Sequence, residues 1–159
     1  MSLLDRFRRK PFERPAPPES VTLAPIGHVR NGVAKPRPDG WEGVESTIEL
    51  LPGHERRAYG IDRYSHVIVV TYLDLAAAAP EKPEQMTLAS GNVYGILATR
   101  SQLRPNHLGV SVVRVLSLEG TNLRVRGLDA IDGTIVLDIK PYLPEYDAVP
   151  AATIPEGKR

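Results

Sequence analysis

Short apolar runs rich in β-branched residues, separated by Gly and Pro, are the feature of this sequence that most restricts its fold. Val, Ile and Thr side chains pack well on the pleated surface of a strand, so each run predicts a strand. The predicted strands span residues 47–51, 67–73, 93–98, 110–118, 123–126 and 134–139. One stretch, 75–79, looks helical, and Pro80 and Pro83 end it before it completes two turns.

Several short strands with few helices predict a mainly β domain. Closure of the sheet removes exposed strand edges, so we expect a small closed or nearly closed β-barrel with minor helical segments. The 159 residues suffice for one domain, which we expect at residues 21–145. A flexible basic and proline-rich tail is expected at 1–20, and a loose C-terminal tail at 146–159. The basic cluster of the first tail is either a nucleic-acid arm or a solvated linker.

A β-hairpin between the fourth and fifth predicted strands is the clearest local feature. Gly and Asn lie in the connection, and both tolerate the positive φ of hairpin turns. Pairing of Leu118 with Leu123 would place both on one face, because side chains alternate along strands. The same face would hold Leu116 and Val125. We predict that this face belongs to the core.

The composition excludes several kinds of site. The chain has no cysteine, which excludes disulfides, thiolate zinc sites and cysteine nucleophiles, and its four histidines are scattered, so we predict no metal. Lys and Arg number 20 against 19 Asp and Glu, so a nucleic-acid partner would need a local basic patch. The N-terminus lacks the apolar stretch of a signal peptide, and no apolar run approaches the roughly 20 residues that span a bilayer. We expect a cytoplasmic protein without a membrane partner.

Common catalytic motifs are absent, including the phosphate loop, Gly-x-Gly-x-x-Gly, His-Glu-x-x-His and Gly-x-Ser-x-Gly. Two polar stretches beside predicted strands, 98–109 and 127–142, are the candidates for a site, because rigid strands often hold functional loops. Asp132-Gly133 fits a hairpin turn and a ligand role about equally. Asp138 and Lys140 point the same way and can form a surface ion pair. Trp41, the only tryptophan, either covers a ligand or anchors a satellite core.

Four stretches match a known family in its order along the chain. They are 26–30, 60–66, 95–111 and 127–142, and the last two carry the most specific motifs, ATRS with RPN and DGT with DIKPY. With them the sequence resembles the TsaA-like family, whose characterised bacterial members are the S-adenosylmethionine-dependent tRNA methyltransferases called TrmO. The resemblance implies a YaeB-like β-barrel that binds S-adenosylmethionine without a Rossmann domain and works as a homodimer, with the cofactor near the subunit interface. The family methylates N6 of threonylcarbamoyladenosine next to the anticodon, so tRNA is the expected partner.

The resemblance also implies the residues of the site. The implied cofactor contacts are Pro36, Arg37, Pro38, Asp74, Leu75, Arg100, Val110, Ile131, Asp132, Gly133 and Thr134. The guanidinium of Arg100 suits the methionyl carboxylate, and Asp74 or Asp132 suits the ribose hydroxyls, the amino group or the sulfonium. The accepting nitrogen is urea-like and a poor nucleophile, so we hypothesise that Asp132 takes its proton. Lys140 and Tyr142 would orient the substrate.

Some positions depart from the usual pattern of the family. His107 and Gln102 stand where Pro is common, and Leu73-Asp74 replaces an aromatic residue and a His that are frequent there. Two other functions therefore stay open. One is methylation of a small molecule, which the near-neutral charge favours. The other is a non-catalytic module that senses S-adenosylmethionine, which the departures favour.

Arginines are the candidates for a tRNA-binding surface. They are Arg56, Arg57, Arg63, Arg104, Arg114, Arg124 and Arg126. If several of them lie on one side, they can bind phosphates with an affinity that falls steeply with salt. The alternative is a solvated barrel exterior.

Overall fold

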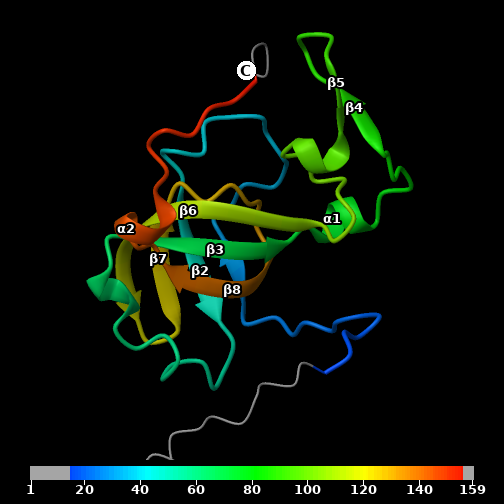
Figure 1. Ribbon diagram of the computed structural model, residues 1–159. Helices are drawn as coiled ribbons and strands as arrows, with labels where there is room; N and C mark the ends of the chain where they lie inside the picture. The colour runs from blue at the N-terminus through cyan, green and yellow to red at the C-terminus, as the bar shows by residue number, and fades with distance from the viewer. Residues whose placement is uncertain (1–14, 156–159) are drawn as a thin grey trace, which may run out of the picture.

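The computed structural model describes residues 15–155 (Figure 1). Six strands form a closed antiparallel barrel: β1 (Gly27–Arg30), β2 (Glu45–Leu50), β3 (His66–Tyr72), β6 (Leu108–Glu119), β7 (Asn122–Arg126) and β8 (Ile135–Pro141). Their order around the barrel is β1-β2-β7-β6-β3-β8, and β8 pairs with β1 to close it. The predicted mainly β barrel is confirmed.

The remaining elements are short. The strands β4 (Gln85–Thr87) and β5 (Val93–Gly95) form a separate two-stranded sheet, which projects from the barrel above α1 in Figure 1. One-turn helices are α1 (Asp74–Ala77) and α2 (Pro144–Asp147), and 3₁₀ turns are η2 (Ile61–Arg63) and η3 (Ile96–Ala98). The helix expected at 75–79 is α1. The strands β1 and β4 and the helix α2 were not predicted.

The predicted strand at 93–98 is wrong over its second half. After Gly95 the chain turns as η3, and both the backbone N–H and the hydroxyl of Thr99 donate to the Ile96 carbonyl, at 3.2 and 2.8 Å. A Thr side chain that satisfies a nearby carbonyl competes with strand pairing. Ile96 is buried by this turn.

The predicted hairpin is present, with one correction to its core face. Leu118 pairs with Leu123 as expected, but the register shifts between Val115 and Ser117, so that Val115 lies opposite Val125. A bulge adds one residue to a strand and thereby exchanges its two faces. Val115 packs against the core, and the assignment of Leu116 to that face is wrong.

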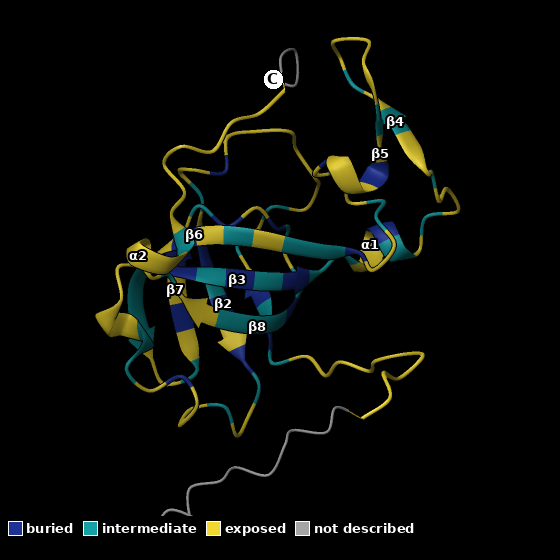
Figure 2. Cartoon of the chain, in the orientation of Figure 1, coloured by how far each residue is buried: buried dark blue, intermediate teal, exposed yellow. Residues whose placement is uncertain are grey.

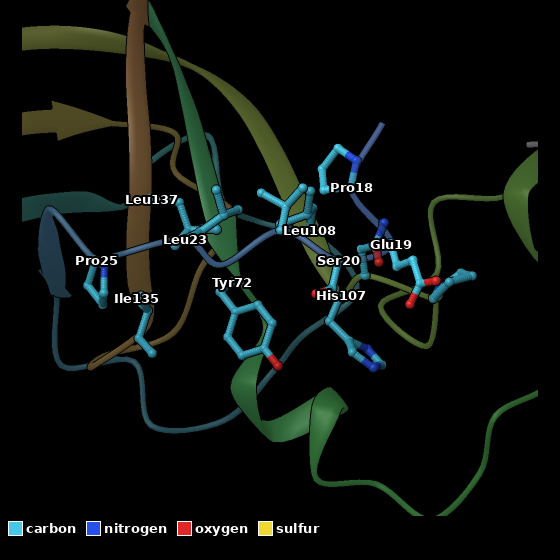
Figure 3. Close-up of a pocket in the computed structure, with 13 residues that line it drawn as sticks. Pro18, Glu19, Ser20, Leu23, Pro25, Tyr72, His107, Leu108, Ile135 and Leu137 are labelled. Atoms are coloured by element: carbon cyan, nitrogen blue, oxygen red, sulfur yellow. The ribbon is translucent and has the colours of Figure 1, made fainter. Parts of the chain in front are cut away.

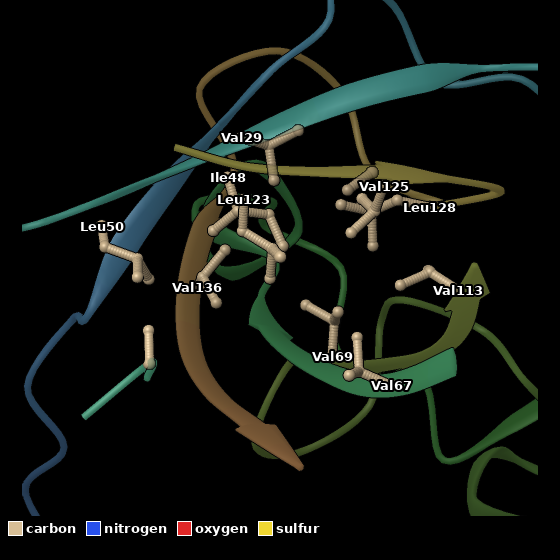
Figure 4. Packing of buried hydrophobic residues seen from close by; sticks show 12 residues of the cluster. Val29, Ile48, Leu50, Val67, Val69, Val113, Leu123, Val125, Leu128 and Val136 are labelled. Carbon is tan, nitrogen blue, oxygen red and sulfur yellow. The ribbon is translucent and has the colours of Figure 1, made fainter. Parts of the chain in front are cut away.

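The core fills the inside of the barrel, and every barrel strand contributes to it (Figure 4). It consists of Val29, Ile48, Leu50, Ala58, Val67, Val69, Val113, Leu123, Val125, Leu128, Ala130 and Val136. The strand β3 is apolar on both faces: Val67 and Val69 belong to the core, and Ile68 and Val70 alternate with them on the outer face, where they are only partly buried. Figure 2 shows this alternation of buried and intermediate residues along β3.

Most of the expected N-terminal tail, including the basic cluster at 6–14, lies outside the described residues, as do the last four residues, 156–159. Residues 15–20 form no helix or strand. Within 15–155, none of the helices has the length and apolarity needed to cross a bilayer.

Candidate functional site

A pocket of about 360 Å³ opens between α1, the beginning of β6 and three loops. We call it the α1 pocket, and its loops span residues 36–41, 100–104 and 129–134. Most of the residues expected to contact a cofactor line it: Pro36, Arg37, Asp74, Leu75, Arg100, Val110, Ile131 and Thr134. Pro38, Asp132 and Gly133 do not line it. The fold therefore gathers separate stretches of the sequence around one cavity.

Close packing between β3 and β6 forms one wall of the α1 pocket. Gly109 lies opposite Thr71 in the strand pairing, and a Cβ atom at Gly109 would collide with the buried Thr71 hydroxyl. The Leu73 N–H donates to the His107 carbonyl at 2.8 Å, directly before α1 begins. These contacts join the beginning of α1 to the loop that precedes β6.

Three arginines line the α1 pocket and make it positively charged: Arg37, Arg100 and Arg104. Arg100 donates to the Val110 carbonyl at 2.7 Å, and Arg104 donates to the Thr99 carbonyl at 3.0 Å through Nη2. The Nε of Arg104 is buried and has no hydrogen-bond partner. A buried N–H without an acceptor is unfavourable. Arg104 as a residue also lines the pocket, where its positive charge favours an anionic group.

Trp41 and Arg37 form the outer rim of the pocket. The Arg37 guanidinium carbon lies 4.7 Å from the centre of the Trp41 ring, and the Trp41 Nε1 donates to the Arg37 carbonyl at 3.2 Å. Trp41 is buried and also lines the pocket, so its position is compatible with either of the roles considered for it, anchor or cover.

Two carboxylates, Asp74 and Asp129, complete the lining. Asp129 is exposed as a whole residue, yet partial burial of its carboxyl raises its pKa, and attraction from the nearby Arg100 opposes that shift only in part. Sequence reasoning missed Asp129 because the neighbouring Asp132-Gly133 fitted the family motif. Within the described residues, no group of three or more His, Asp or Glu side chains could hold a metal ion.

Asp132 is bound to the protein's own backbone. Its Oδ1 accepts the N–H groups of Asn31 and Gly32, at 2.8 and 3.2 Å, and its Oδ2 lies 3.8 Å from Nη1 of Arg30. These backbone hydrogen bonds, with a smaller contribution from the Arg30 charge, lower the pKa of Asp132. Such a carboxylate cross-links the loop before β8 to the turn after β1, and its low pKa makes it a weak proton acceptor.

Lys140 and Tyr142 lie at the opposite end of β8 from the α1 pocket. In the pairing with β3, Ile135 lies opposite Tyr72, next to α1, whereas Lys140 lies opposite Ile68. Lys140 pairs with Asp138 at 2.6 Å on the surface, as one of the two interpretations expected, and this bond raises the pKa of Lys140. Neither Lys140 nor Tyr142 lines the pocket.

His107 connects the loop before β6 to α1 through Lys82. Its Nδ1 lies 3.2 Å from the Gln102 carbonyl, and its Nε2 lies 3.3 Å from Nζ of Lys82, which also donates to the Ala77 carbonyl at 3.0 Å. Because an ammonium group can only donate, Nε2 accepts and Nδ1 carries the proton. The backbone of His107 has φ 50°, a conformation that the Pro usual in the family cannot adopt.

A second, larger pocket of about 760 Å³ lies between residues 18–25 and the outer face of the barrel (Figure 3). Leu23 packs there near Leu108 and Leu137, beside the Tyr72 ring (Figure 3). Leu108 lines both pockets, so the loop before β6 separates them. None of the residues that the resemblance assigned to the cofactor lines this second pocket.

Comparison with known proteins identifies the family. Residues 30–148 match the family model of the tRNA-methyltransferase O N-terminal domain. The chain belongs to this family. It is 32% identical over 140 residues to a probable S-adenosyl-L-methionine-binding protein of Pyrococcus abyssi, a match that covers 82% of this chain and 72% of that protein. It is 35% identical over 98 residues to the human tRNA (adenine(37)-N6)-methyltransferase, covering 59% of this chain and 22% of that protein.

Solved structures of the tRNA-methyltransferase O family have the same fold. TrmO from Pseudomonas aeruginosa superposes with a TM-score of 0.70 at 32% identity, and the match covers 86% of this chain and 61% of that one. The chain thus spans about three fifths of the length of that TrmO protein. The family resemblance found in the sequence is confirmed.

Proposed function

We propose that this chain binds S-adenosylmethionine in the α1 pocket and transfers its methyl group to an adenine of tRNA. The observation that carries the cofactor assignment is that separate stretches of the chain, all within the family match at residues 30–148, converge on one pocket that Arg100 and Arg104 line. The names of the relatives support the same chemistry: one is a probable S-adenosyl-L-methionine-binding protein, and another is a tRNA methyltransferase.

The residues of the α1 pocket suit the groups that S-adenosylmethionine carries. Arg100 and Arg104 would hold its carboxylate, because guanidinium groups bind carboxylates with paired, charge-assisted hydrogen bonds. Asp74 would accept hydrogen bonds from the ribose hydroxyls or the amino group. When bound, the cofactor supplies an activated methyl group without a metal, so the contribution of the protein is alignment.

We assign proton removal from the accepting nitrogen to Asp129 rather than Asp132. Asp129 lines the pocket and has a raised pKa, which makes its carboxylate the stronger base of the two. The two hydrogen bonds from backbone N–H groups occupy the Oδ1 of Asp132 outside the pocket. Asp132 therefore acts as a cross-link that holds the loop bearing Asp129, Ile131 and Thr134.

The finer substrate that we propose is threonylcarbamoyladenosine next to the anticodon, methylated at N6. The match of the two specific motifs to the family supports this substrate. Asp129 also supports it, because a urea-like nitrogen is a poor nucleophile and needs a base to remove its proton. A tRNA substrate would also place the activity in the cytoplasm, the location expected from the sequence.

A non-catalytic S-adenosylmethionine-binding module is the second candidate. Two observations favour it: Lys140 and Tyr142 lie away from the α1 pocket, and the loop that carries His107 departs from the family pattern. Binding and turnover therefore need separate measurements.

We further propose that the chain forms a homodimer through the outer face of β3 and β6. Val110 and Val112 are 44% and 51% exposed there, opposite the outward-facing Val70 and Ile68. Val110 also lines the α1 pocket, so this interface would bring the partner subunit to the edge of the cofactor site.

Calorimetric titration with S-adenosylmethionine and with its demethylated product tests the cofactor assignment. We expect saturable binding, and we expect Arg104→Met to raise Kd by about tenfold or more, because it removes charge-assisted hydrogen bonds. Arg124→Met is the matched control, since Arg124 pairs with Glu45 on the barrel exterior. Titration without heat or saturation on the folded wild-type protein would end the proposal.

Methyl transfer to tRNA from a strain that lacks the family enzyme then tests the activity. Mass analysis of the product nucleosides identifies the acceptor. Turnover only on small adenosine derivatives would replace the tRNA substrate with a small molecule, and binding without any turnover would favour the non-catalytic module.

A further inference from the structure

An exposed tyrosine with an arginine over its ring lies at the end of the barrel away from the α1 pocket. Tyr59 is 77% exposed. The guanidinium carbon of Arg63 lies 5.4 Å from the centre of the Tyr59 ring, and the Nη2 of Arg63 donates to the Tyr59 hydroxyl at 3.2 Å. The cation and the hydrogen bond hold the ring in one orientation, although little of it is buried.

The segment that carries this ring is anchored on the core. Ala58, directly before Tyr59, is buried in the core cluster, and Ile61 packs against the same cluster. Gly60 turns the chain between them with φ 83°, and the N–H of Ile61 donates to the Ala58 carbonyl at 3.0 Å. An aromatic ring that is both exposed and fixed loses little conformational entropy when it binds a partner.

Arginines without a salt bridge in the described part of the structure precede and follow the ring in the chain. Arg56 and Arg57 are exposed, and neither they nor Arg63 forms a salt bridge within residues 15–155. Other surface arginines differ in this respect, because Arg124 and Arg126 both pair with Glu45, at 2.9 and 2.6 Å. The arginines proposed from the sequence are thereby sorted: Glu45 pairs with Arg124 and Arg126, whereas Arg56, Arg57 and Arg63, like the exposed Arg114 on β6, form no salt bridge within residues 15–155.

We propose that Tyr59 and Arg63, with Arg56 and Arg57 beside them, form a platform on which an unpaired base of tRNA stacks while its phosphates contact the arginines. This inference rests on the proposed function. Single-stranded RNA is recognised by this combination of an exposed aromatic face and cations that follow the backbone. With Arg63 over one face of the ring, the base stacks on the other face.

The platform and the α1 pocket lie at opposite ends of β3. The strand begins at His66, just after η2, and ends at Tyr72, just before α1 (Figure 1). Seven residues of strand span roughly 20 Å. A platform at this distance contacts nucleotides other than the methylated one, so it serves binding of a whole tRNA and not the chemical step.

Filter binding of full-length tRNA to the whole chain tests the platform. We expect Tyr59→Ala to raise the Kd for tRNA by about fivefold or more, the loss that removal of one base-stacking ring brings. We expect Arg57→Met to reduce the slope of log Kd against log salt by about one, because one phosphate contact is lost. The Kd for S-adenosylmethionine and kcat on a five-nucleotide substrate should stay at the wild-type values in both variants.

Two matched variants test whether the expected effects are specific to the platform or arise from any exposed tyrosine or any surface arginine. Tyr146 is 85% exposed and lacks an arginine over its ring, so Tyr146→Ala should leave tRNA affinity unchanged. Arg124→Met should leave the salt slope unchanged, because Glu45 neutralises Arg124. An unchanged melting temperature of Tyr59→Ala shows that the fold is intact.

The outcomes distinguish the platform from the proposed function. The platform alone would be overturned if Tyr59→Ala bound tRNA with wild-type affinity. It would also be overturned if Tyr146→Ala lost as much tRNA affinity as Tyr59→Ala. If the wild-type protein binds no tRNA, the platform and the tRNA substrate both fall, while the titration with S-adenosylmethionine still tests the cofactor.

Discussion

Asp129 and Asp132 lie three positions apart in one loop and meet opposite environments. Burial against the pocket wall favours the protonated form of Asp129, whereas the N–H groups of Asn31 and Gly32 favour the charged form of Asp132. A proton acceptor needs a carboxylate that is basic and faces the substrate. Only Asp129 combines a place in the pocket lining with a raised pKa.

Substitution of each aspartate by asparagine separates the two roles. We expect Asp129→Asn to lower kcat by about 10²- to 10⁴-fold, the usual contribution of a general base. Because the carboxylate is the active form, the wild-type rate should rise with pH through the pKa of Asp129, which lies above the ordinary value of about 3.9. Asp129→Asn should lack this rising limb in a pH profile of kcat.

Asp132→Asn should instead keep kcat within a few-fold of wild type, because the amide oxygen still accepts the two backbone N–H groups. Its effect belongs to stability. A lowered pKa means that the ionised Asp132 stabilises the fold above the pKa of the unfolded chain, and that this contribution is lost as pH falls through the folded value. The melting temperature of Asp132→Asn should therefore fall less between pH 7 and pH 3 than that of the wild-type protein. If Asp132→Asn lost as much turnover as Asp129→Asn, the assignment of the base to Asp129 would be wrong.

At the scale of elements, α1 and the loop before β6 form one wall because His107 and Lys82 connect them. Lys82 binds carbonyl groups at the end of α1, and His107 binds Lys82 and the Gln102 carbonyl. Asp74 on α1 and Arg104 in the loop both line the pocket. The relative position of these two side chains therefore depends on the His107–Lys82 contact.

Restoring the proline of the family at position 107 should displace this wall. Proline cannot reach φ 50° and lacks the N–H that His107 donates to the Arg104 carbonyl, so we expect His107→Pro to raise the Kd for S-adenosylmethionine by about tenfold. Lys82→Met, which removes only side-chain hydrogen bonds, should raise it by about three- to fivefold. Calorimetry measures both, with Lys140→Met as the control at the far end of β8. If His107→Pro binds S-adenosylmethionine with wild-type affinity, then the position of α1 relative to the loop before β6 does not depend on the His107–Lys82 contact.

The fold was predictable from the sequence where pairing is local. The hairpin between β6 and β7 is set by its short connection, Gly120 and Thr121, and the buried strand β3 by its run of β-branched residues. The four-residue strand β1 was missed because its pairing with β2 and β8 depends on distant segments. The bulge at Val115 was invisible for a related reason, since alternation along one strand does not reveal a residue added against its partner.

The lining of the α1 pocket was predictable as a set of stretches and not as a set of side-chain orientations. The resemblance assigned the positions of Arg100, Asp74 and Thr134 to one cofactor site, and all three line one pocket although they are distant in sequence. The resemblance did not reveal which aspartate of the 129–134 loop turns toward the pocket, because the turn at Gly133 and the N–H groups of another loop decide it. The burial that raises the pKa of Asp129 and the hydrogen bonds that lower the pKa of Asp132 exist only in the folded chain.

At the scale of the whole molecule, the outside of the barrel has two different characters. The outer face of β2 and β7 carries ion pairs between Glu45 and the arginines Arg124 and Arg126. The outer face of β3 and β6 carries Ile68, Val70, Val110 and Val112 instead. A charged face suits water, and an apolar face this close to a binding pocket suits a protein interface.

Light scattering coupled to size-exclusion chromatography tests this interface. We expect the wild-type protein to have twice its chain mass of 17.5 kDa. Val112→Asp should produce the mass of one chain, because dimer formation would remove the new carboxylate from water at the centre of an apolar face. Val93→Asp is the matched control: Val93 is 59% exposed on the β4–β5 hairpin, and the same substitution there should leave the dimer intact.

The same variants decide whether the dimer matters for the cofactor. Val110 belongs both to the apolar face and to the lining of the α1 pocket, so a partner subunit would cover part of the pocket opening and exclude water from it. We therefore expect the monomeric Val112→Asp protein to bind S-adenosylmethionine more weakly than wild type, while Val93→Asp retains wild-type affinity. A wild-type protein that elutes as a single chain and still binds the cofactor would show that one subunit completes the site, and the apolar face would then need another partner.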